Sequence, residues 1–319
     1  MKKLIRQISF LMFLFILACS SDRNYSEKTI RIATLNCEFL WDGLEPEEGN
    51  LTVEFPHKGK PALAREHIYN IAEVIKSINA DIINLAEVEG IAVLKFLNDT
   101  FLTDLKYYIG FIEGRDTYTG QDVAILSKFP INKIFRFDEK GRSGEIEKSV
   151  SKNYVADITV ENTDITFIGI HLLSGPSDVS RIDERQAQAD AIKQIALKKA
   201  KEGNLIVVLG DFNDYDGDTN CIDVNNNLPV SNVLNIIKES GNLVNTASLI
   251  LKDQRYTSHW DKDNQGDVDN DELSSIDYIL VSQDLFQNVE SAEIYHNYNP
   301  LEVSDHFPVI VDLIISIGQ

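Results

Sequence analysis

Short apolar runs rich in β-branched residues recur along the chain, separated by polar and turn-forming residues. Runs of this kind predict strands of a buried sheet. They comprise residues 30–35, 81–86, 123–127, 155–160, 165–170, 205–210, 276–281 and 308–315. Two longer segments predict helices, because 62–78 places isoleucines at helical spacing and 183–200 is rich in Ala, Gln and Lys. Since strands and helices alternate, the pattern indicates an α/β protein.

Residues that can carry chemistry lie at the ends of these predicted strands. Those that directly follow an apolar run are Asn36, Glu87, His171 and Asp211. Those that stand at the start of one are Asp277 and the triplet Ser304, Asp305 and His306. If all of them share one rim, the last two strands must run opposite to the first four. A doubly wound parallel sheet cannot meet this condition. We therefore predict a four-layered α/β sandwich, in which two mixed, mostly antiparallel sheets are flanked by helices.

The N-terminal residues have the features of an export signal. Basic residues precede an apolar stretch at 8–18, which is too short to span a bilayer comfortably, and Cys19 follows a small alanine. This pattern resembles a bacterial lipoprotein cleavage site, in which Cys19 becomes the lipidated first residue. Ordinary secretion with cleavage nearby, or an uncleaved anchor, is the alternative. We expect a signal peptide at 1–19, a tether at 20–28 and one domain at 29–319, placed outside the cytoplasm.

The composition is that of a soluble globular protein. The chain has 319 residues, of which 43% are hydrophobic and 25% charged, and this excludes a disordered, collagen-like or multi-pass membrane protein. Its formal net charge of -20 repels nucleic acid at long range, so a substrate phosphate would need a cation beside it. Cys37 and Cys221 could pair in an oxidising compartment, although two separate thiols are the expected state.

The predicted rim has the ligand types that a hard divalent cation prefers. It combines carboxylates, amides and imidazoles, contributed by Asn36, Glu87, His171, Asp211, Asn213, Asp277, Asp305 and His306. Oxygen-rich sites of this kind suit Mg²⁺, with Mn²⁺ or Ca²⁺ as alternatives, whereas Zn²⁺ would require more His or Cys ligands. A metal ion would also supply the positive field that an acidic protein lacks beside a phosphate.

Seven short motifs, in this order, resemble those of the endonuclease/exonuclease/phosphatase superfamily, which includes deoxyribonuclease I, exonuclease III and bacterial sphingomyelinases. The sharpest are Gly-Asp-Phe-Asn at 210–213, Ile-Asp-Tyr at 276–278 and Ser-Asp-His-Phe-Pro at 304–308. The others contain Asn36, Glu87, Ser127 and His171. The resemblance extends from about residue 30 to residue 313. It implies a deoxyribonuclease I-like fold and metal-assisted hydrolysis of a phosphate ester by in-line attack of water.

The resemblance also implies roles for residues that would hold the metal and the water. Glu87 would be the principal metal ligand, with Asn36 and Asp305 beside it. Asp211 and Asn213 would position or deprotonate the attacking water and hold the phosphate.

Two histidines complete the implied machinery. Asp277 would orient His306 and stabilise its cationic form. His171 would serve as a general acid to the leaving oxygen, with Asp122 as an orienting carboxylate or, alternatively, as a solvated turn residue. Arg185 could reach the substrate phosphate, although an exposed helical arginine is the more common case.

A second acidic segment fits the twelve-residue calcium loop of EF-hands. Its oxygen-bearing residues are Asp261, Asp263, Gln265, Asp267, Asp269 and Glu272, with Gly266 at the turn position. The flanking segments are strand-like rather than helical. We expect a structural Ca²⁺ loop without the EF-hand helices, or alternatively an acidic, solvated hairpin loop.

These observations together favour a metal-dependent phosphodiester hydrolase, specifically an extracytoplasmic nuclease that acts as a monomer and touches the membrane only through a lipid anchor. A phospholipid or sugar-phosphate phosphodiesterase or phosphatase of the same superfamily is the alternative. Residues for binding DNA are few, since Arg142, Lys148 and Lys152 form a thin cluster, and no apolar aromatic hairpin for entering a bilayer is evident. A noncatalytic, calcium-binding surface lipoprotein is a more distant alternative.

Overall fold

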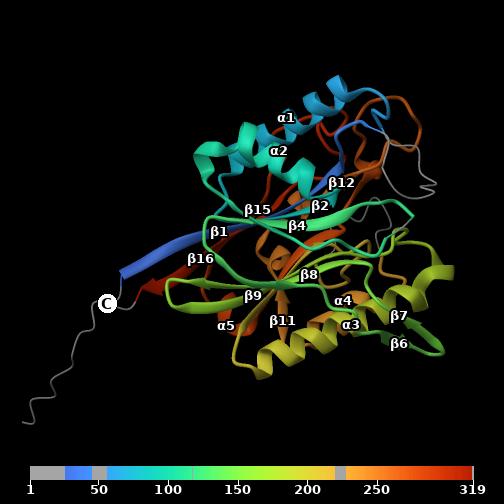
Figure 1. Ribbon diagram of the computed structural model, residues 1–319. Helices are drawn as coiled ribbons and strands as arrows, with labels where there is room; N and C mark the ends of the chain where they lie inside the picture. The colour runs from blue at the N-terminus through green and yellow to red at the C-terminus, as the bar shows by residue number, and fades with distance from the viewer. Residues whose placement is uncertain (1–25, 45–55, 117, 220–227, 318–319) are drawn as a thin grey trace, which may run out of the picture.

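The computed structural model describes residues 26–44, 56–116, 118–219 and 228–317. The predicted signal peptide with Cys19 lies outside these residues, and so does Cys221, which is expected to be a separate thiol from Cys37. Two six-stranded sheets pack face to face, and helices cover the outer face of each sheet (Figure 1). The predicted four-layered α/β sandwich is therefore confirmed.

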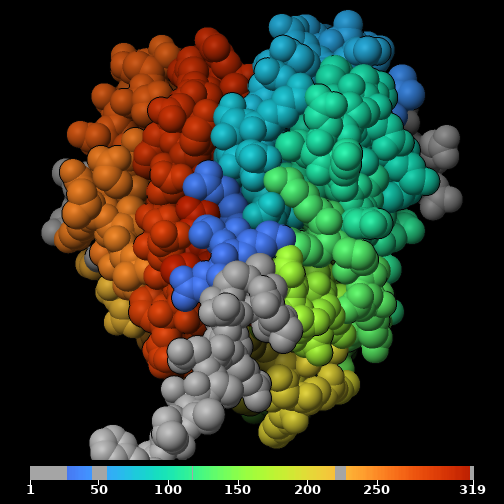
Figure 2. All heavy atoms as spheres, turned by 90° about the vertical axis from the view of Figure 1, so that its left-hand side faces the viewer, coloured from blue at the N-terminus to red at the C-terminus, as the bar shows by residue number. Residues whose placement is uncertain are grey.

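The first sheet has one parallel pair of strands in an otherwise antiparallel arrangement. Its order is β15 (Val289–Ile294), β16 (Val309–Ile317), β1 (Ser26–Leu40), β2 (Ile82–Val88), β4 (Asp122–Ser127) and β3 (Tyr108–Phe111). Strands β1 and β2 are parallel, and β16 runs antiparallel to β1. The end of the chain thus lies beside its beginning, and Figure 2 shows the start of β1 (blue) directly against C-terminal residues (red).

The second sheet repeats this pattern of strand directions. Its order is β11 (Leu243–Asn245), β14 (Asp277–Ser282), β10 (Leu205–Asp211), β9 (Thr163–His171), β8 (Lys152–Val160) and β5 (Ile131–Phe135). Strands β9 and β10 are parallel, and β14 runs antiparallel to β10. In each sheet the strand that comes late in the chain, β16 or β14, therefore runs opposite to the earlier parallel pair. This is the arrangement predicted from the positions of the polar residues at the strand ends.

Helices and small hairpins complete the fold. The helices are α1 (Pro61–Ile78), α2 (Ile91–Phe101), α3 (Ile182–Lys201), α4 (Val233–Lys238) and α5 (Gln283–Phe286). The hairpins are β6 (Gly141–Ser143) with β7 (Ile146–Lys148), and β12 (Ser258–His259) with β13 (Leu273–Ser274). Helices α1 and α2 cover the first sheet, and α3 and α4 cover the second (Figure 1).

Side chains alternate between two environments along the central strands, as the period of a strand requires. In β1, Ile30 and Ile32 enter the core between the sheets, whereas Ala33 and Leu35 pack with residues of α1 and α2. The strands of the second sheet divide in the same way between the central core and the layer beneath α3 and α4. No helix in the described part of the chain has the length and apolar character needed to cross a membrane.

Candidate active site

The candidate site is the polar end of the core between the two sheets. In β10, Val207 and Leu209 point into this core, and Asp211 continues the same alternation. His171 continues the alternation of Phe167 in β9. Strand pairing then aligns the polar residues, because Asp211 lies opposite both Asp277 of β14 and His171 of β9. The alternation of apolar residues thus places Asp211, Asp277 and His171 side by side at the same end of the second sheet.

A backbone irregularity brings Glu87 to the same place from the first sheet. Simple alternation would send Glu87 to the helix side with Leu85, which packs in the core beneath α1 and α2. The register of β2 shifts here, and Glu87 has a left-handed φ of 60°. This local bulge re-aims the carboxylate towards the core between the sheets. The Nδ2 atom of Asn36 donates to Glu87 Oε1 over 3.1 Å.

Asn36 joins the two sheets at the centre of the site. Its Nδ2 atom lies 3.1 Å from both Glu87 Oε1 and Asp211 Oδ2, and 3.4 Å from His306 Nε2. Asn36 is 1% exposed and Asp211 is 2% exposed, so these polar groups are held almost without solvent. The predicted convergence of distant strand ends is therefore present in the structure.

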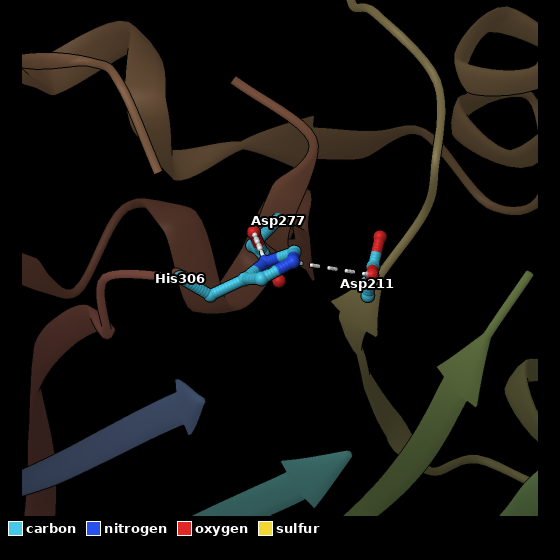
Figure 3. A group of neighbouring side chains, drawn as sticks. All are labelled: Asp211, Asp277 and His306. Atoms are coloured by element: carbon cyan, nitrogen blue, oxygen red, sulfur yellow. Dashed lines mark hydrogen bonds and ion pairs between the residues drawn. The ribbon is translucent and has the colours of Figure 1, made fainter. Parts of the chain in front are cut away.

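His306 and Asp277 form a buried pair at this site (Figure 3). His306 Nδ1 lies 2.8 Å from Asp277 Oδ2, which leaves Nε2 directed towards Asp211 Oδ2 at 4.0 Å and Asp305 Oδ1 at 3.8 Å. Burial alone would lower the pKa of His306, but the carboxylates of Asp277 and Asp305 raise it well above its ordinary value. His306 is thus held in its cationic form.

His171 has the opposite electrostatic setting. Its Nε2 atom lies 3.5 Å from Asp211 Oδ2 and 3.9 Å from Glu87 Oε1. Burial, together with the positive charges of Lys152 and His306, lowers the pKa of His171 well below its ordinary value. The two imidazoles at one site therefore differ in charge, which is the arrangement that separates acid from base roles.

The structure does not form the expected pair between Asp122 and His171. His171 Nδ1 has no hydrogen-bond partner among the described residues. Asp122 is 7% exposed and accepts a hydrogen bond from the backbone of Gly114, while burial raises its pKa to about 6. Gly114 is needed for this contact, because a Cβ there would lie 1.8 Å from Asp122 Oδ1. Asp122 is therefore neither an orienting carboxylate for His171 nor a solvated turn residue.

Asn213 contributes through its backbone as well as its side chain. Its backbone N–H donates to Asp211 Oδ1 over 2.8 Å and its Nδ2 atom donates to Leu172 O over 3.2 Å. Its φ of 46° is left-handed, a conformation that asparagine tolerates better than most residues. The turn after β10 thereby holds Asp211 and the residue following His171 together.

Sequence reasoning missed the polar support of Glu87. Gln121 Nε2 donates to Glu87 Oε2 over 2.9 Å, and the Oε1 atom of Gln121 accepts from Lys152 Nζ over 3.3 Å. Lys152 is 8% exposed and also contacts Asp116 over 3.2 Å. Its inward position follows the alternation of Tyr154 in β8, and that signal could have identified it. Lys152 is therefore part of the site and not of a surface cluster with Arg142 and Lys148, which form exposed ion pairs with glutamates.

Glu38 is a further acidic group that the sequence analysis missed. Its Oε2 atom accepts from the backbone N–H of Asp305 over 2.9 Å. Burial and the nearby carboxylate of Asp305 raise the pKa of Glu38 to about 8. The left-handed φ of 47° at Glu38 turns it towards the site, and no periodic pattern reveals such a turn.

Arg185 neither reaches a substrate site nor lies exposed. It is 0% exposed, and its Nε atom bonds Asp214 Oδ2 over 2.9 Å. Its other donors bond the backbone oxygens of Gly175 and Pro176. Arg185 therefore ties together the chain segments that follow His171 and Asp211, and both sequence-based interpretations of this residue were wrong.

The donor set at the rim fits a hard divalent cation. Carboxylates outnumber cations there, and burial together with the charge of Asp277 raises the pKa of Asp211 to about 7. Ligand atoms of Asp211, Asp277 and His306 lie within 4.8 Å of one another, although Asp277 Oδ2 and His306 Nδ1 bond each other. Since that pair is engaged, the carboxylates of Glu87 and Asp305 are the better candidates to hold a metal ion. The oxygen of Asn36 accepts a hydrogen bond from the backbone N–H of Glu38 over 3.1 Å, so Asn36 presents its amide nitrogen to the site.

Comparison with known proteins agrees with this geometry. The model of the endonuclease/exonuclease/phosphatase family matches residues 33–306. The chain belongs to this family. As a member, it is an enzyme that hydrolyses phosphate ester bonds. A search of curated proteins finds no match to the sequence.

Solved structures of other proteins share the fold. An endonuclease/exonuclease/phosphatase family protein from Leptotrichia buccalis is 19% identical, with a TM-score of 0.57. The 3′ phosphatase NExo from Neisseria, bound to a product DNA hairpin, is 18% identical, with a TM-score of 0.60. The 3′-5′ exonuclease NExo from Neisseria meningitidis is 18% identical, with a TM-score of 0.59. Each comparison covers 89% of this chain and 99% of the other.

In this family member, the predicted calcium loop connects β12 to β13, so it has no helix pair around it. Ligand atoms of Asp261, Asp263 and Glu272 lie within 4.8 Å of one another. Asp261 Oδ1 is buried and has no hydrogen-bond partner in the described part of the chain. The side chain of Gln265 instead donates to Asp263 Oδ2 over 2.9 Å. The group that converges therefore contains three of the six predicted oxygen-bearing residues, and Gln265, Asp267 and Asp269 are not part of it.

Proposed function

We propose that the chain is a divalent-metal-dependent nuclease that works outside the cytoplasm. The observation that carries this proposal is the convergence of Asn36, Glu87, Asp211 and the His306–Asp277 pair from both sheets at one end of the core. The group is richer in carboxylates than in cations, which suits capture of a dication and a phosphate together. Mg²⁺ is the proposed ion, with Mn²⁺ or Ca²⁺ as alternatives.

The residues divide the work according to their charge. Glu87 and Asp305 would hold the metal ion, and Asn36 would join them by turning its amide oxygen towards the site. The ion would polarise a phosphoryl oxygen when bound. Asp211, whose pKa is raised to about 7, is suited to accept a proton from the attacking water near neutral pH. Cationic His306 would donate a hydrogen bond to the phosphate, and its partner Asp277 fixes its orientation. His171 and Asn213 would lie beside the leaving and attacking oxygens.

Nucleic acid is the favoured substrate class. The 3′ phosphatase NExo, with the same fold, carries a DNA hairpin in its structure, which is a property of that protein and supports the proposal for this one. A phospholipid or sugar phosphate is the alternative substrate. In the described hairpin of β6 and β7, Ile146 is the one large apolar residue that is exposed, which is less than insertion into a bilayer requires.

A panel assay tests the proposal. The purified chain is incubated with Mg²⁺, Mn²⁺ or Ca²⁺ and with plasmid DNA, RNA, sphingomyelin or bis-p-nitrophenyl phosphate. We expect cleavage of DNA or RNA that stops when EDTA removes the metal. Cleavage of sphingomyelin alone would select the lipid alternative, and no hydrolysis of DNA or RNA would contradict the proposed nuclease function. His57→Ala, outside the site, serves as the matched control for His306→Ala.

The location is proposed from the N-terminal sequence alone. We propose lipidation at Cys19, attachment to the cell envelope through that lipid and a monomeric catalytic domain. Labelling cells with a radioactive fatty acid should label the wild-type chain but not Cys19→Ser. An unlabelled wild-type chain in the medium would instead indicate ordinary secretion.

The loop between β12 and β13 is proposed to bind a structural Ca²⁺ ion. The support is the convergence of Asp261, Asp263 and Glu272 on one point, with one oxygen of Asp261 buried and unpaired among the residues that the structure describes. Ca²⁺ should raise the melting temperature of the wild-type chain but not of Asp263→Asn. Asp253→Asn, in the short helix at 252–254, is the matched control, and an equal response of all three proteins would refute the site.

A further inference from the structure

The two tryptophans of the chain have opposite environments. Trp41 is 3% exposed and belongs to the buried core, whereas Trp260 is 74% exposed. A tryptophan left this open withholds a large apolar surface from the core, and surface aromatics of this size are enriched where a protein binds a partner. Packing of the fold therefore does not explain why Trp260 is exposed.

Hydrogen bonds place Trp260 at the edge of the active site. Ser258 forms a β-bridge with His306, and the N–H of His259 donates to the carbonyl of Asp305 over 2.7 Å. The next residue is Trp260, whose own N–H donates to the carbonyl of Glu272 over 3.0 Å. One residue of a strand advances the chain by about 3.4 Å, so the backbone of Trp260 directly continues the segment that is hydrogen-bonded to Asp305.

The charge around Trp260 restricts which part of a substrate it can meet. The segment from Asp261 to Glu272 contains six acidic residues and one lysine. Such a field repels the phosphates of a nucleic acid and also an anionic lipid surface. The face of a nucleobase carries no net charge, so the acidic residues do not repel it. A base is therefore the part of a nucleic acid that can contact Trp260. Stacking of a base on an indole is favourable for every base, because each has a π-face.

We propose that Trp260 is a stacking platform for an unpaired base next to the scissile phosphate. The proposal rests on the proposed nuclease function and deepens it. It assigns the enzyme a preference for single-stranded or frayed nucleic acid, since a base paired within a duplex cannot offer its face to an indole. Trp260 would contribute to substrate binding, while the chemistry remains with Asp211 and His306.

Intrinsic fluorescence tests the contact without any turnover. Turnover is suppressed with Asp211→Asn, so that Mg²⁺ can be present, and because Trp41 is buried a change on adding a ligand reports mainly on Trp260. A short oligothymidylate should quench the emission of Asp211→Asn, and an abasic oligomer of equal length should not. Equal responses to the two oligomers, or an oligothymidylate response retained in Trp260→Leu, would overturn the proposal. A response to phosphatidylcholine vesicles but not to oligothymidylate would also overturn it.

Kinetics with single-stranded oligonucleotides provide the second test. Trp260→Leu keeps an apolar side chain without a flat ring and should raise KM by about tenfold to a hundredfold, because base stacking is lost. Trp260→Phe should recover most of this loss. Tyr108→Ala removes an exposed aromatic residue paired with Ser127 at the other end of β4, and it serves as the control.

The two tests separate this proposal from the proposed function. Oligothymidylate that quenches Trp260 but is never cleaved would support the platform and refute the nuclease. Oligonucleotides that are cleaved with equal KM by the wild-type chain and by Trp260→Leu would overturn the platform and leave the nuclease intact.

Discussion

Asp211 and Asp214 lie three positions apart in one turn, and both are buried, but their surroundings differ. Asp214 has its own cation, because Arg185 Nε bonds its Oδ2 atom over 2.9 Å and neither side chain is exposed. Asp216, two residues further on, is paired with Lys238 over 2.7 Å. Asp211 instead faces other carboxylates and an asparagine amide. One segment thus contains buried aspartates that are paired with a cation and a buried aspartate that is not.

The difference separates acids that hold the fold from acids that are kept for a ligand. A buried charge requires a partner, and a protein cation supplies it permanently at Asp214 and Asp216. At Asp211 the compensating charge has to come from elsewhere, namely from His306 and from a bound dication. Burial raises the pKa of both Asp211 and Asp214, but Ser231 and Arg185 oppose the rise at Asp214. At Asp211 the charges of Asp277 and Glu87 add to the effect of burial, and the pKa reaches about 7.

Replacing Asp211 should produce the largest functional loss. Asp211→Asn keeps the shape of the side chain but cannot accept a proton, so turnover should fall by about 10²- to 10⁴-fold. His306→Ala should lower turnover by roughly 10²-fold or more for the same class of reason. Both variants should remain folded, which circular dichroism and chemical unfolding in EDTA would check. Turnover equal to that of the wild-type chain would remove either residue from the mechanism.

Removing the cation from the structural pair should instead affect stability. Arg185→Met leaves Asp214 buried without its partner and should lower the free energy of unfolding by about 3–5 kcal/mol. Urea unfolding measures this change. The double variant Arg185→Met with Asp214→Leu removes both charges and should recover part of the loss. If the single variant were as stable as the wild-type chain, the comparison between Asp211 and Asp214 would fail.

The sequence predicts the acids that are kept for a ligand better than it predicts the residues that position them. Asp211, His171 and Asp277 extend the alternation of apolar strands, so a period of two residues is enough to bring them together. Glu87 breaks that alternation through a bulge and was identified by its motif, not by periodicity. Glu38 depends on a left-handed backbone turn that no pattern reveals.

Residues in helices and in edge strands were also difficult to predict from the sequence. Arg185 shares a helix face with the buried Ala189 and Ile192, which is a helical spacing that indicates burial, but its charge suggested exposure. Helix α2 and the edge strands β3, β5 and β15 were not predicted. Strand β15 is partly exposed along its length, so it lacks the apolar run that marks the central strands.

The stability of the metal-free protein should depend on pH. The raised pKa values of Asp211, about 7, and Glu38, about 8, favour the protonated carboxyls in the folded state. Unfolded carboxyls ionise at lower pH, so stability should fall as pH rises towards these values. His306, with its raised pKa, contributes in the same direction, since its stabilising charge is lost at high pH.

Between about pH 6 and pH 8 we expect a net loss of a few kcal/mol in EDTA, since His171, whose pKa is lowered, opposes part of the effect of the carboxyls and His306. Saturating Mg²⁺ should remove most of this loss, because the dication stabilises the ionised carboxylates. Asp211→Asn should reduce the loss even without metal, whereas Asp253→Asn should not. Thermal unfolding across this range measures the effect, and a metal-free stability that is constant or rises with pH would contradict it.

Gln121 shows how an acid kept for a ligand is supported differently from an acid that holds the fold. Lys152 donates to Gln121 Oε1, so the amide nitrogen faces Glu87 Oε2 at 2.9 Å. The lysine thus acts on Glu87 through a neutral amide, which orients the carboxylate without neutralising it as Arg185 neutralises Asp214. Asp116, in contact with Lys152 over 3.2 Å, holds the lysine in this position.

Removing this amide should weaken metal binding more than it weakens the fold. Gln121→Met has a similar length but no donor, so the dissociation constant for Mg²⁺ should rise by about tenfold, the lower end of the usual effect of losing a partner of a metal ligand. Calorimetric titration with Mg²⁺ measures this without substrate, and Gln287→Met, on an exposed residue after α5, is the control. Lys152→Met should have an effect in the same direction, because the amide is then free to turn its oxygen towards Glu87. Unchanged Mg²⁺ affinity in both variants would mean that Glu87 is positioned by Asn36 and its backbone contacts alone.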